Sequence, residues 1–168
     1  MARQVLFVCT GNICRSPMAE GLLRAALPKG TIWRVTSAGT STLDGFGASA
    51  HAIDVMAEKG ISIKAHRSQS ATRDRVSLSD VIIAMTAEHA RTLTSRFPEC
   101  RDRIHLMRAF DPGSPPGSDV SDPFGGTLAE YRACCALLHK SMPGLLAFLE
   151  AHGGRAEGMG RAPREPSP

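Results

Sequence analysis

Two short runs of the sequence are apolar at every position, and they limit the fold more than any other feature. Residues 5–8 read Val-Leu-Phe-Val, and residues 81–85 read Val-Ile-Ile-Ala-Met. A strand with one face in water alternates apolar and polar residues, so an uninterrupted apolar run predicts a strand buried on both faces. Such strands are typical of parallel sheets that helices cover on both sides.

The rest of the chain alternates between helix-like and strand-like patterns. We expect strands at residues 4–8, 33–37, 80–85 and 103–107, and helices at residues 17–27, 48–59, 86–97 and 128–151. This alternation predicts a three-layer α/β sandwich, in which right-handed crossovers join a four-stranded parallel sheet with helices on both faces. A loop rich in Pro, Gly, Ser and Asp at residues 108–126 is long enough to be functional or disordered.

Length and composition favour one domain in the cytoplasm. Of the 168 residues, we expect residues 1–152 to form the domain and residues 153–168, rich in Gly, Pro, Arg and Glu, to form a disordered tail. The apolar run at residues 5–8 is shorter than the roughly 7–15 residues of a signal-peptide core. No run approaches the roughly 18 apolar residues of a membrane span, so no membrane association is expected.

The cysteines and the charges exclude several classes of protein. The five cysteines have irregular spacing, which predicts free thiols; they are Cys9, Cys14, Cys100, Cys134 and Cys135. No set of Cys and His has the spacing of metal ligands, so neither a metal nor another cofactor is expected. The formal charge of +4 comes from scattered basic residues, which would tolerate an anionic substrate but give no basis for a nucleic-acid partner.

The most unusual stretch follows the first strand, where residues 9–17 read Cys-Thr-Gly-Asn-Ile-Cys-Arg-Ser-Pro. Ligands of parallel sheets bind beyond the carboxyl ends of the strands. Pro17 suits the first turn of the next helix, so the chain must curl around that helix N-terminus, and Gly11 and Asn12 tolerate the positive φ that a curl requires. We call the curled residues the phosphate loop; they are Thr10, Gly11, Asn12, Ile13, Cys14, Arg15 and Ser16.

Such a loop can bind an anion and activate the cysteine beside it. Backbone N–H groups that point inward, together with the helix dipole, form a site for phosphate or a similar oxyanion, and Arg15 can add a bidentate clamp. The same field favours the thiolate of Cys9, to which Ser16 can donate a hydrogen bond. The alternative is a buried cysteine near a surface arginine, but the Gly-Asn and Ser-Pro pairs and the strand–helix junction favour the functional interpretation.

Residues 9–20, Cys-Thr-Gly-Asn-Ile-Cys-Arg-Ser-Pro-Met-Ala-Glu, resemble the signature of the low-molecular-weight protein tyrosine phosphatase family. The similarity extends over about residues 4–150. It implies a hydrolase that dephosphorylates proteins through a phosphocysteine at Cys9, with Arg15 holding phosphate and Ser16 stabilising the thiolate. It also implies that Asn12 keeps the loop in shape, and that the fold is a four-stranded parallel sheet with flanking helices.

A phosphocysteine mechanism needs an acid for the leaving group and then a base for water, and one carboxyl group can serve both steps. Residues 108–126 offer Asp111, Asp119 and Asp122. The acid of the family lies in an Asp-Pro-aromatic motif, which Asp122-Pro123-Phe124 matches. We therefore expect Asp122 to be the acid and the other two to be solvated loop residues.

The resemblance implies roles for two further residues. Cys14 corresponds to a cysteine that can form a reversible disulfide with the nucleophile and protect it from over-oxidation; the alternative is that Cys14 packs beneath the loop. His66 matches a position that supports the loop through Ser16 or Asn12, although an ordinary surface histidine is also compatible with the sequence.

Some residues favour phosphotyrosine as the substrate and others favour phosphoarginine. The Asp-Pro-Phe-Gly-Gly motif and residues 47–52 resemble the bacterial arginine-directed branch, and tyrosine-directed members more often have Tyr after Asp-Pro and an aromatic residue near Leu43. That branch usually has Thr at the position of Ile13, however, and Ile offers an apolar wall suited to an aromatic ring. We favour phosphotyrosine, with phosphoarginine as the alternative.

Two other activities are less compatible with the sequence. The thiol-linked arsenate reductases of the family need further cysteines, and residues 17–99 contain none. A phosphate- or phosphopeptide-binding module without turnover would need no nucleophile or acid, so the joint presence of Cys9, Arg15, Ser16 and Asp122 argues against one.

Overall fold

The computed structural model describes residues 2–153 of the chain. Its strands are β1 (Arg3–Cys9), β2 (Trp33–Gly39), β3 (Val81–Ala84) and β4 (Ile104–Leu106). Its helices are α1 (Arg15–Ala26), α2 (Ala50–Glu58), α3 (Arg73–Ser77), α4 (Ala87–Arg96) and α5 (Leu128–Gly153), with short 3-10 helices η1 (Pro98–Arg103) and η2 (Met107–Phe110). All the predicted strands and helices are present; α3, η1 and η2 were not predicted.

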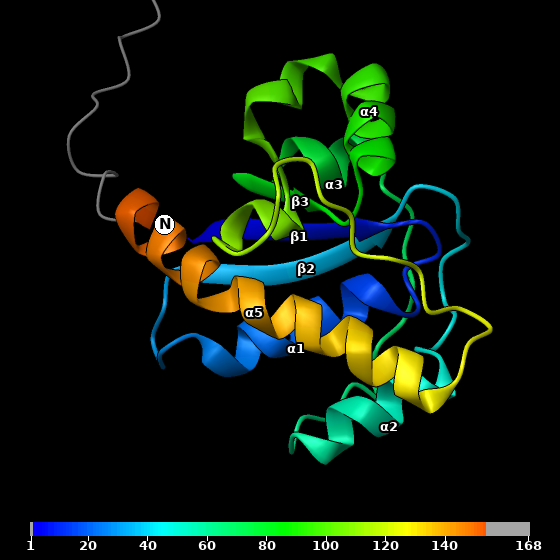
Figure 1. The fold of residues 1–168 in the computed structure, drawn as a ribbon. Helices are drawn as coiled ribbons and strands as arrows, with labels where there is room; N and C mark the ends of the chain where they lie inside the picture. The colour runs from blue at the N-terminus through cyan, green and yellow to red at the C-terminus, as the bar shows by residue number, and fades with distance from the viewer. Residues whose placement is uncertain (1, 154–168) are drawn as a thin grey trace, which may run out of the picture.

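The strands form one parallel sheet in the order β2-β1-β3-β4. Helices α1 and α5 cover one face, with α2 packed against them, while α3 and α4 lie on the other face (Figure 1). The predicted α/β sandwich with a four-stranded parallel sheet is thereby confirmed.

The apolar run in β1 is uninterrupted because both faces of this strand are buried. Val5 and Phe7 pack in a cluster with α1 and α5, whereas Leu6 and Val8 pack in a second cluster with α4. Successive side chains of a strand point to opposite faces, so each apolar residue serves one of the two clusters.

Strand order determines where the phosphate loop lies. The chain passes from β1 to β2 on one side and then crosses to β3 on the other side of β1. The carboxyl end of β1 is therefore the switch point of the sheet, where ligands of such folds bind. The phosphate loop starts there, because Cys9 is the last residue of β1.

The loop predicted at residues 108–126 is present, but it begins a few residues later than expected and is attached to the core. Its first residues belong to η2, and residues 111–127, here called the acid loop, lead to α5. Val120 in this loop is fully buried, and its backbone N–H donates to the carbonyl of Met85 at 2.8 Å.

The predicted tail begins at Gly153, which is the last residue of α5, and residues 154–168 lie outside the described part of the chain. None of the helices in residues 2–153 combines the length and the hydrophobicity that a membrane crossing requires.

Gly39 at the end of β2 is predicted to be essential for the packing of the phosphate loop. A Cβ at this position would lie 2.5 Å from the carbonyl oxygen of Thr10 and 2.8 Å from Cγ2 of Thr42. We expect Gly39→Ala to lower the free energy of unfolding in urea by about 1–3 kcal/mol, the usual cost of overpacking.

Gly47→Ala is the matched control, because the nearest atom to its added Cβ is Arg67 Nη1 at 3.9 Å. Equal stability of the two variants would contradict the prediction.

Candidate active site

Asn12 determines the path of the phosphate loop. It has a φ of +55° and is the one non-glycine residue with positive φ in the described part of the chain. Gly11, expected to share the left-handed conformation, does not adopt a positive φ. The curl ends at Cys14, the N-cap of α1, and Pro17 lies in the first turn of that helix, as predicted.

The side chain of Asn12 is buried and hydrogen-bonded at each polar atom. Its Nδ2 donates to Ser16 Oγ at 2.8 Å and to Ser37 Oγ at 2.9 Å, and its Oδ1 accepts from the backbone N–H of Gln69 at 3.0 Å. One amide group therefore joins the phosphate loop to β2 and to the segment before α3.

Two donors surround the sulfur of Cys9. Ser16 Oγ lies 2.9 Å from Cys9 Sγ, and the backbone N–H of Asn12 donates to the same sulfur at 3.3 Å. Because Asn12 Nδ2 already donates to Ser16 Oγ, the hydroxyl hydrogen of Ser16 is left to donate to the sulfur. Two donors and the N-terminus of α1 therefore converge on the Cys9 sulfur.

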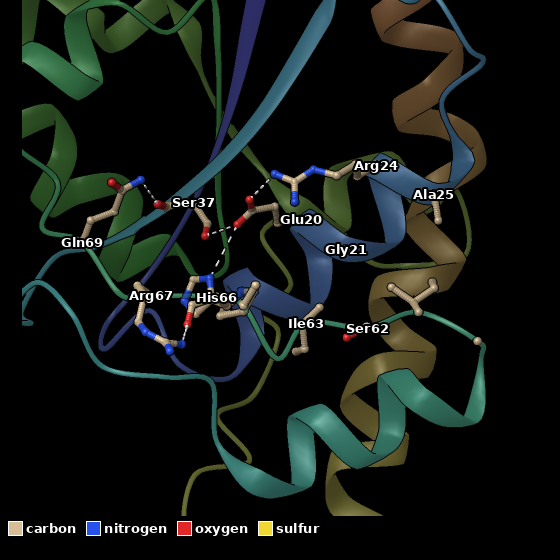
Figure 2. A pocket seen from close by; sticks show the side chains of 14 residues that line it. Glu20, Gly21, Arg24, Ala25, Ser37, Ser62, Ile63, His66, Arg67 and Gln69 are labelled. Atoms are coloured by element: carbon tan, nitrogen blue, oxygen red, sulfur yellow. Dashed lines mark hydrogen bonds and ion pairs between the residues drawn. The ribbon is translucent and has the colours of Figure 1, made fainter.

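A second set of polar residues supports the loop from behind. His66 Nε2 lies 2.6 Å from the carbonyl oxygen of Asn12 and must donate, because a carbonyl only accepts. Glu20 on α1 accepts from Ser37 Oγ at 2.5 Å and from Arg24 at 2.5 Å, and its Oε2 is 3.9 Å from His66 Nδ1. Figure 2 shows Glu20 between these three partners, on the wall of a hollow of about 490 Å³.

Sequence reasoning did not single out Glu20. Its only signal was its position at the end of the signature at residues 9–20. The structure places His66 at the backbone of Asn12, one of the two residues suggested as its partner.

Arg15 is buried and only partly satisfied by the protein. Its Nη1 donates to the carbonyl of Val120 at 2.9 Å, and its Nη2 is 3.4 Å from Asp122 Oδ2. Its Nε is the single buried side-chain nitrogen or oxygen without a hydrogen-bond partner in residues 2–153. A buried donor without an acceptor is costly, so this nitrogen indicates an acceptor site in front of the guanidinium.

The candidate nucleophile, clamp and acid share one hollow of about 210 Å³. It is lined by Cys9, Thr10, Gly11, Ile13, Cys14, Arg15, Asp122 and Phe124. The side chain of Asp122 is 48% exposed, so it is open to water as well as to the hollow that it lines.

The other two aspartates of the acid loop lie outside this hollow. Asp111 accepts from Gly113 and Ser114 within its own turn. Asp119 is exposed, as expected of a loop residue, but its Oδ1 also accepts from the backbone N–H of Ala87 at 2.8 Å.

A larger hollow of about 640 Å³ adjoins the first and shares Gly11 and Ile13 with it. Its far wall includes Leu43 and Phe46, and Phe46 is 56% exposed. Sequence reasoning sought an aromatic residue near Leu43 and overlooked Phe46, three positions later.

Cys14 is buried, and its thiol contacts two hydroxyl groups. Cys14 Sγ lies 3.3 Å from Ser49 Oγ and 3.2 Å from Tyr131 Oη. Burial raises the pKa of the Cys14 thiol, and burial also raises the pKa of Tyr131 to about 12. Both groups are therefore protonated at neutral pH, and the disulfide between Cys14 and Cys9 stays a prediction, since all five cysteines are free.

No cluster of three or more His, Cys, Asp or Glu side chains within residues 2–153 is arranged to hold a metal ion.

The sequence and the fold are similar to those of known phosphatases. Residues 4–155 match the family described as low molecular weight phosphotyrosine protein phosphatase. A protein-arginine-phosphatase from Geobacillus stearothermophilus is 41% identical over 133 residues, which cover 79% of this chain and 86% of the relative. A probable low molecular weight protein-tyrosine-phosphatase from Ralstonia solanacearum is 34% identical over 153 residues, 91% of this chain and 100% of the relative. The solved YwlE arginine phosphatase from Geobacillus stearothermophilus has a TM-score of 0.82 at 36% identity, covering 95% of this chain and 99% of its own.

The environment of the cysteines predicts selective alkylation. Burial raises the pKa of Cys14 and Cys135, and it raises the pKa of Cys134 to about 12, so these thiols stay protonated at pH 7. We expect iodoacetate at pH 7 to modify Cys9 at least about tenfold faster than these three, because the thiolate is the reactive form. Mass spectrometry of digested protein measures the rates, and added phosphate should slow the reaction at Cys9. If Cys9 reacted at the same rate as the other thiols, and if phosphate did not slow its reaction, the predicted activation of Cys9 in an anion site would be wrong.

Proposed function

Because this chain belongs to the low molecular weight phosphotyrosine protein phosphatase family, we propose that it hydrolyses phosphotyrosine in proteins through a phosphocysteine at Cys9. One observation carries the proposal: a single hollow contains the Cys9 sulfur between two donors, the incompletely paired guanidinium of Arg15 and the carboxyl group of Asp122.

The phosphate group binds in the phosphate loop at the N-terminus of α1. Backbone N–H groups of the loop and the helix dipole stabilise its negative charge. Arg15 Nε lacks a partner and Nη2 is 3.4 Å from Asp122, so these two nitrogens are available to form a bidentate pair with two phosphate oxygens.

In the first step, the Cys9 thiolate attacks phosphorus in line with the leaving oxygen. The S–P bond forms as the P–O bond to the tyrosine breaks, and Asp122 gives its proton to the departing oxygen. In the second step, the Asp122 carboxylate takes a proton from water, whose oxygen attacks phosphorus. The S–P bond then breaks, which releases phosphate and restores the thiolate.

Asn12, Ser16 and His66 are proposed to support this chemistry through hydrogen bonds. Ser16 donates to the sulfur, so it stabilises the thiolate both before attack and as the leaving group of the second step. Asn12 orients Ser16, and His66 holds the carbonyl of Asn12. Cys14 is proposed to protect Cys9 from over-oxidation by forming a reversible disulfide.

Apolar side chains around the hollow support an aromatic substrate. Ile13 is half-buried and lines both hollows, while Phe46 and Phe124 are 56% and 68% exposed. Aromatic rings pack well against such surfaces. Phosphoarginine is the second candidate, and the 41% identical relative named protein-arginine-phosphatase favours it.

The partner in this reaction is a phosphorylated protein, and we place the reaction in the cytoplasm. Five free cysteines fit a reducing compartment, in which a nucleophilic thiol persists.

Replacement of Asp122 by Asn tests the acid. The amide cannot give a proton, so kcat/KM for phenyl phosphate should fall by about 10²–10⁴, the usual contribution of a general acid. Nitrophenyl phosphate, whose leaving group needs little protonation, should lose much less in kcat/KM. Equal losses for the two substrates would show that Asp122 is not the acid.

Matched phosphotyrosine and phosphoarginine peptides test the substrate. We expect a larger kcat/KM for phosphotyrosine, and a preference for phosphoarginine of about tenfold or more would overturn this assignment. Ile13→Thr should shift the preference toward phosphoarginine if residue 13 forms the pocket wall. Ile13→Val is the matched control, because Val has nearly the shape of Thr without the hydroxyl, and an equal shift in both variants would exclude a role of the hydroxyl.

A further inference from the structure

The acid loop is attached to the first turn of α4 immediately before the proposed acid. Asp119 Oδ1 accepts from the backbone N–H of Ala87, the first residue of α4, at 2.8 Å. The next residue, Val120, is fully buried, donates to the carbonyl of Met85 and accepts from Arg15 Nη1 at 2.9 Å. Hydrogen bonds to Ala87, Met85 and Arg15 therefore fix residues 119 and 120.

Asp122 lies only two residues beyond this attachment and is itself more loosely held. Its side chain is 48% exposed, and its Oδ1 accepts from the backbone N–H of Phe124 within the same turn at 3.1 Å. Its contact with Arg15 is a single 3.4 Å approach. The position of Asp122 over the hollow therefore depends on where residues 119 and 120 are fixed.

The same turn of α4 also holds the phosphate loop. His89 is 6% exposed, and its Nε2 lies 2.8 Å from Thr10 Oγ1, directly after Cys9. Its Nδ1 lies 2.9 Å from Thr86 Oγ1, the N-cap of α4. Burial, with the nearby Arg15 charge, lowers the pKa of His89, so a neutral ring joins the two hydroxyl groups.

We propose that Asp119 is a positioning residue for the general acid: by accepting the N–H of Ala87 it fixes the acid loop on the turn of α4 that also holds Thr10 through His89, and so sets Asp122 relative to Cys9. This inference rests on the proposed role of Asp122. Asp119 touches no reacting atom and acts only through the loop.

The helix itself does not depend on Asp119. Thr86 caps α4 by accepting from the backbone N–H of His89 at 3.1 Å. Arg108 Nη1 donates to the carbonyl of Asp119 at 3.0 Å, which keeps part of the attachment when the carboxylate is removed. A variant at position 119 should therefore fold and should show a displaced acid rather than a lost one.

The test compares leaving groups in Asp119→Ala, measured as kcat/KM because this constant covers the steps up to departure of the leaving group. We expect a loss of about tenfold for phenyl phosphate and of about twofold or less for nitrophenyl phosphate, a fraction of the full effect of a general acid. Asp119→Asn keeps an oxygen that can accept from Ala87 and should restore the rate for phenyl phosphate. Asp111→Ala is the matched control, since Asp111 bonds only within its own turn among the described residues.

A double variant separates this inference from the proposed function. In the Asp122→Asn background, Asp119→Ala should add no further dependence on the leaving group, because the acid that it positions is gone. Equal losses for both substrates, an additive double variant, or an Asp119→Asn variant as slow as Asp119→Ala would each overturn the positioning role. If Asp122→Asn alone showed no dependence on the leaving group, the acid assignment itself would fall, and this inference with it.

Discussion

The active site depends on a buried amide in a left-handed backbone conformation. Asn12 accepts a φ of +55°, and its side chain recovers the cost through three hydrogen bonds to Ser16, Ser37 and Gln69. These bonds turn the backbone N–H of Asn12 and the hydroxyl of Ser16 toward the sulfur of Cys9. The side chain of Asn12 therefore determines both the shape of the phosphate loop and the surroundings of the Cys9 sulfur. A substitution that removed its hydrogen bonds would also displace the two donors to that sulfur.

The proposed phosphate clamp, Arg15, also contacts the acid loop that carries the proposed general acid, Asp122. Arg15 joins the phosphate loop to the acid loop through the carbonyl of Val120, and it also approaches Asp122. A buried guanidinium with an unpaired Nε is unfavourable in the protein alone, and under the proposed function a bound phosphate would supply the missing acceptor. Under the same proposal, relief of this unpaired donor would contribute to the affinity for the substrate.

The sequence pattern predicts those features that neighbouring residues in the chain determine. It does not reveal the role of a side chain whose hydrogen-bond partner is distant in the sequence. The apolar runs identified β1 and β3, and the spacing of residues 9–17 located the phosphate loop. Helix α3 has five residues, too few to show a helical period. The contributions of Glu20 and Asp119 were missed because their partners, Ser37 on β2 and the backbone of Ala87, are brought close only by the tertiary fold.

The phosphate loop precedes in the sequence most of the residues that support it. Its supports come from residues far along the chain: the contact between Asn12 and His66 spans 54 positions, and the contact between Arg15 and Val120 spans 105. Contacts of such long range slow folding, because loop closure must precede them. The proposed nucleophile therefore gains its complete surroundings only when these distant segments have folded around the phosphate loop.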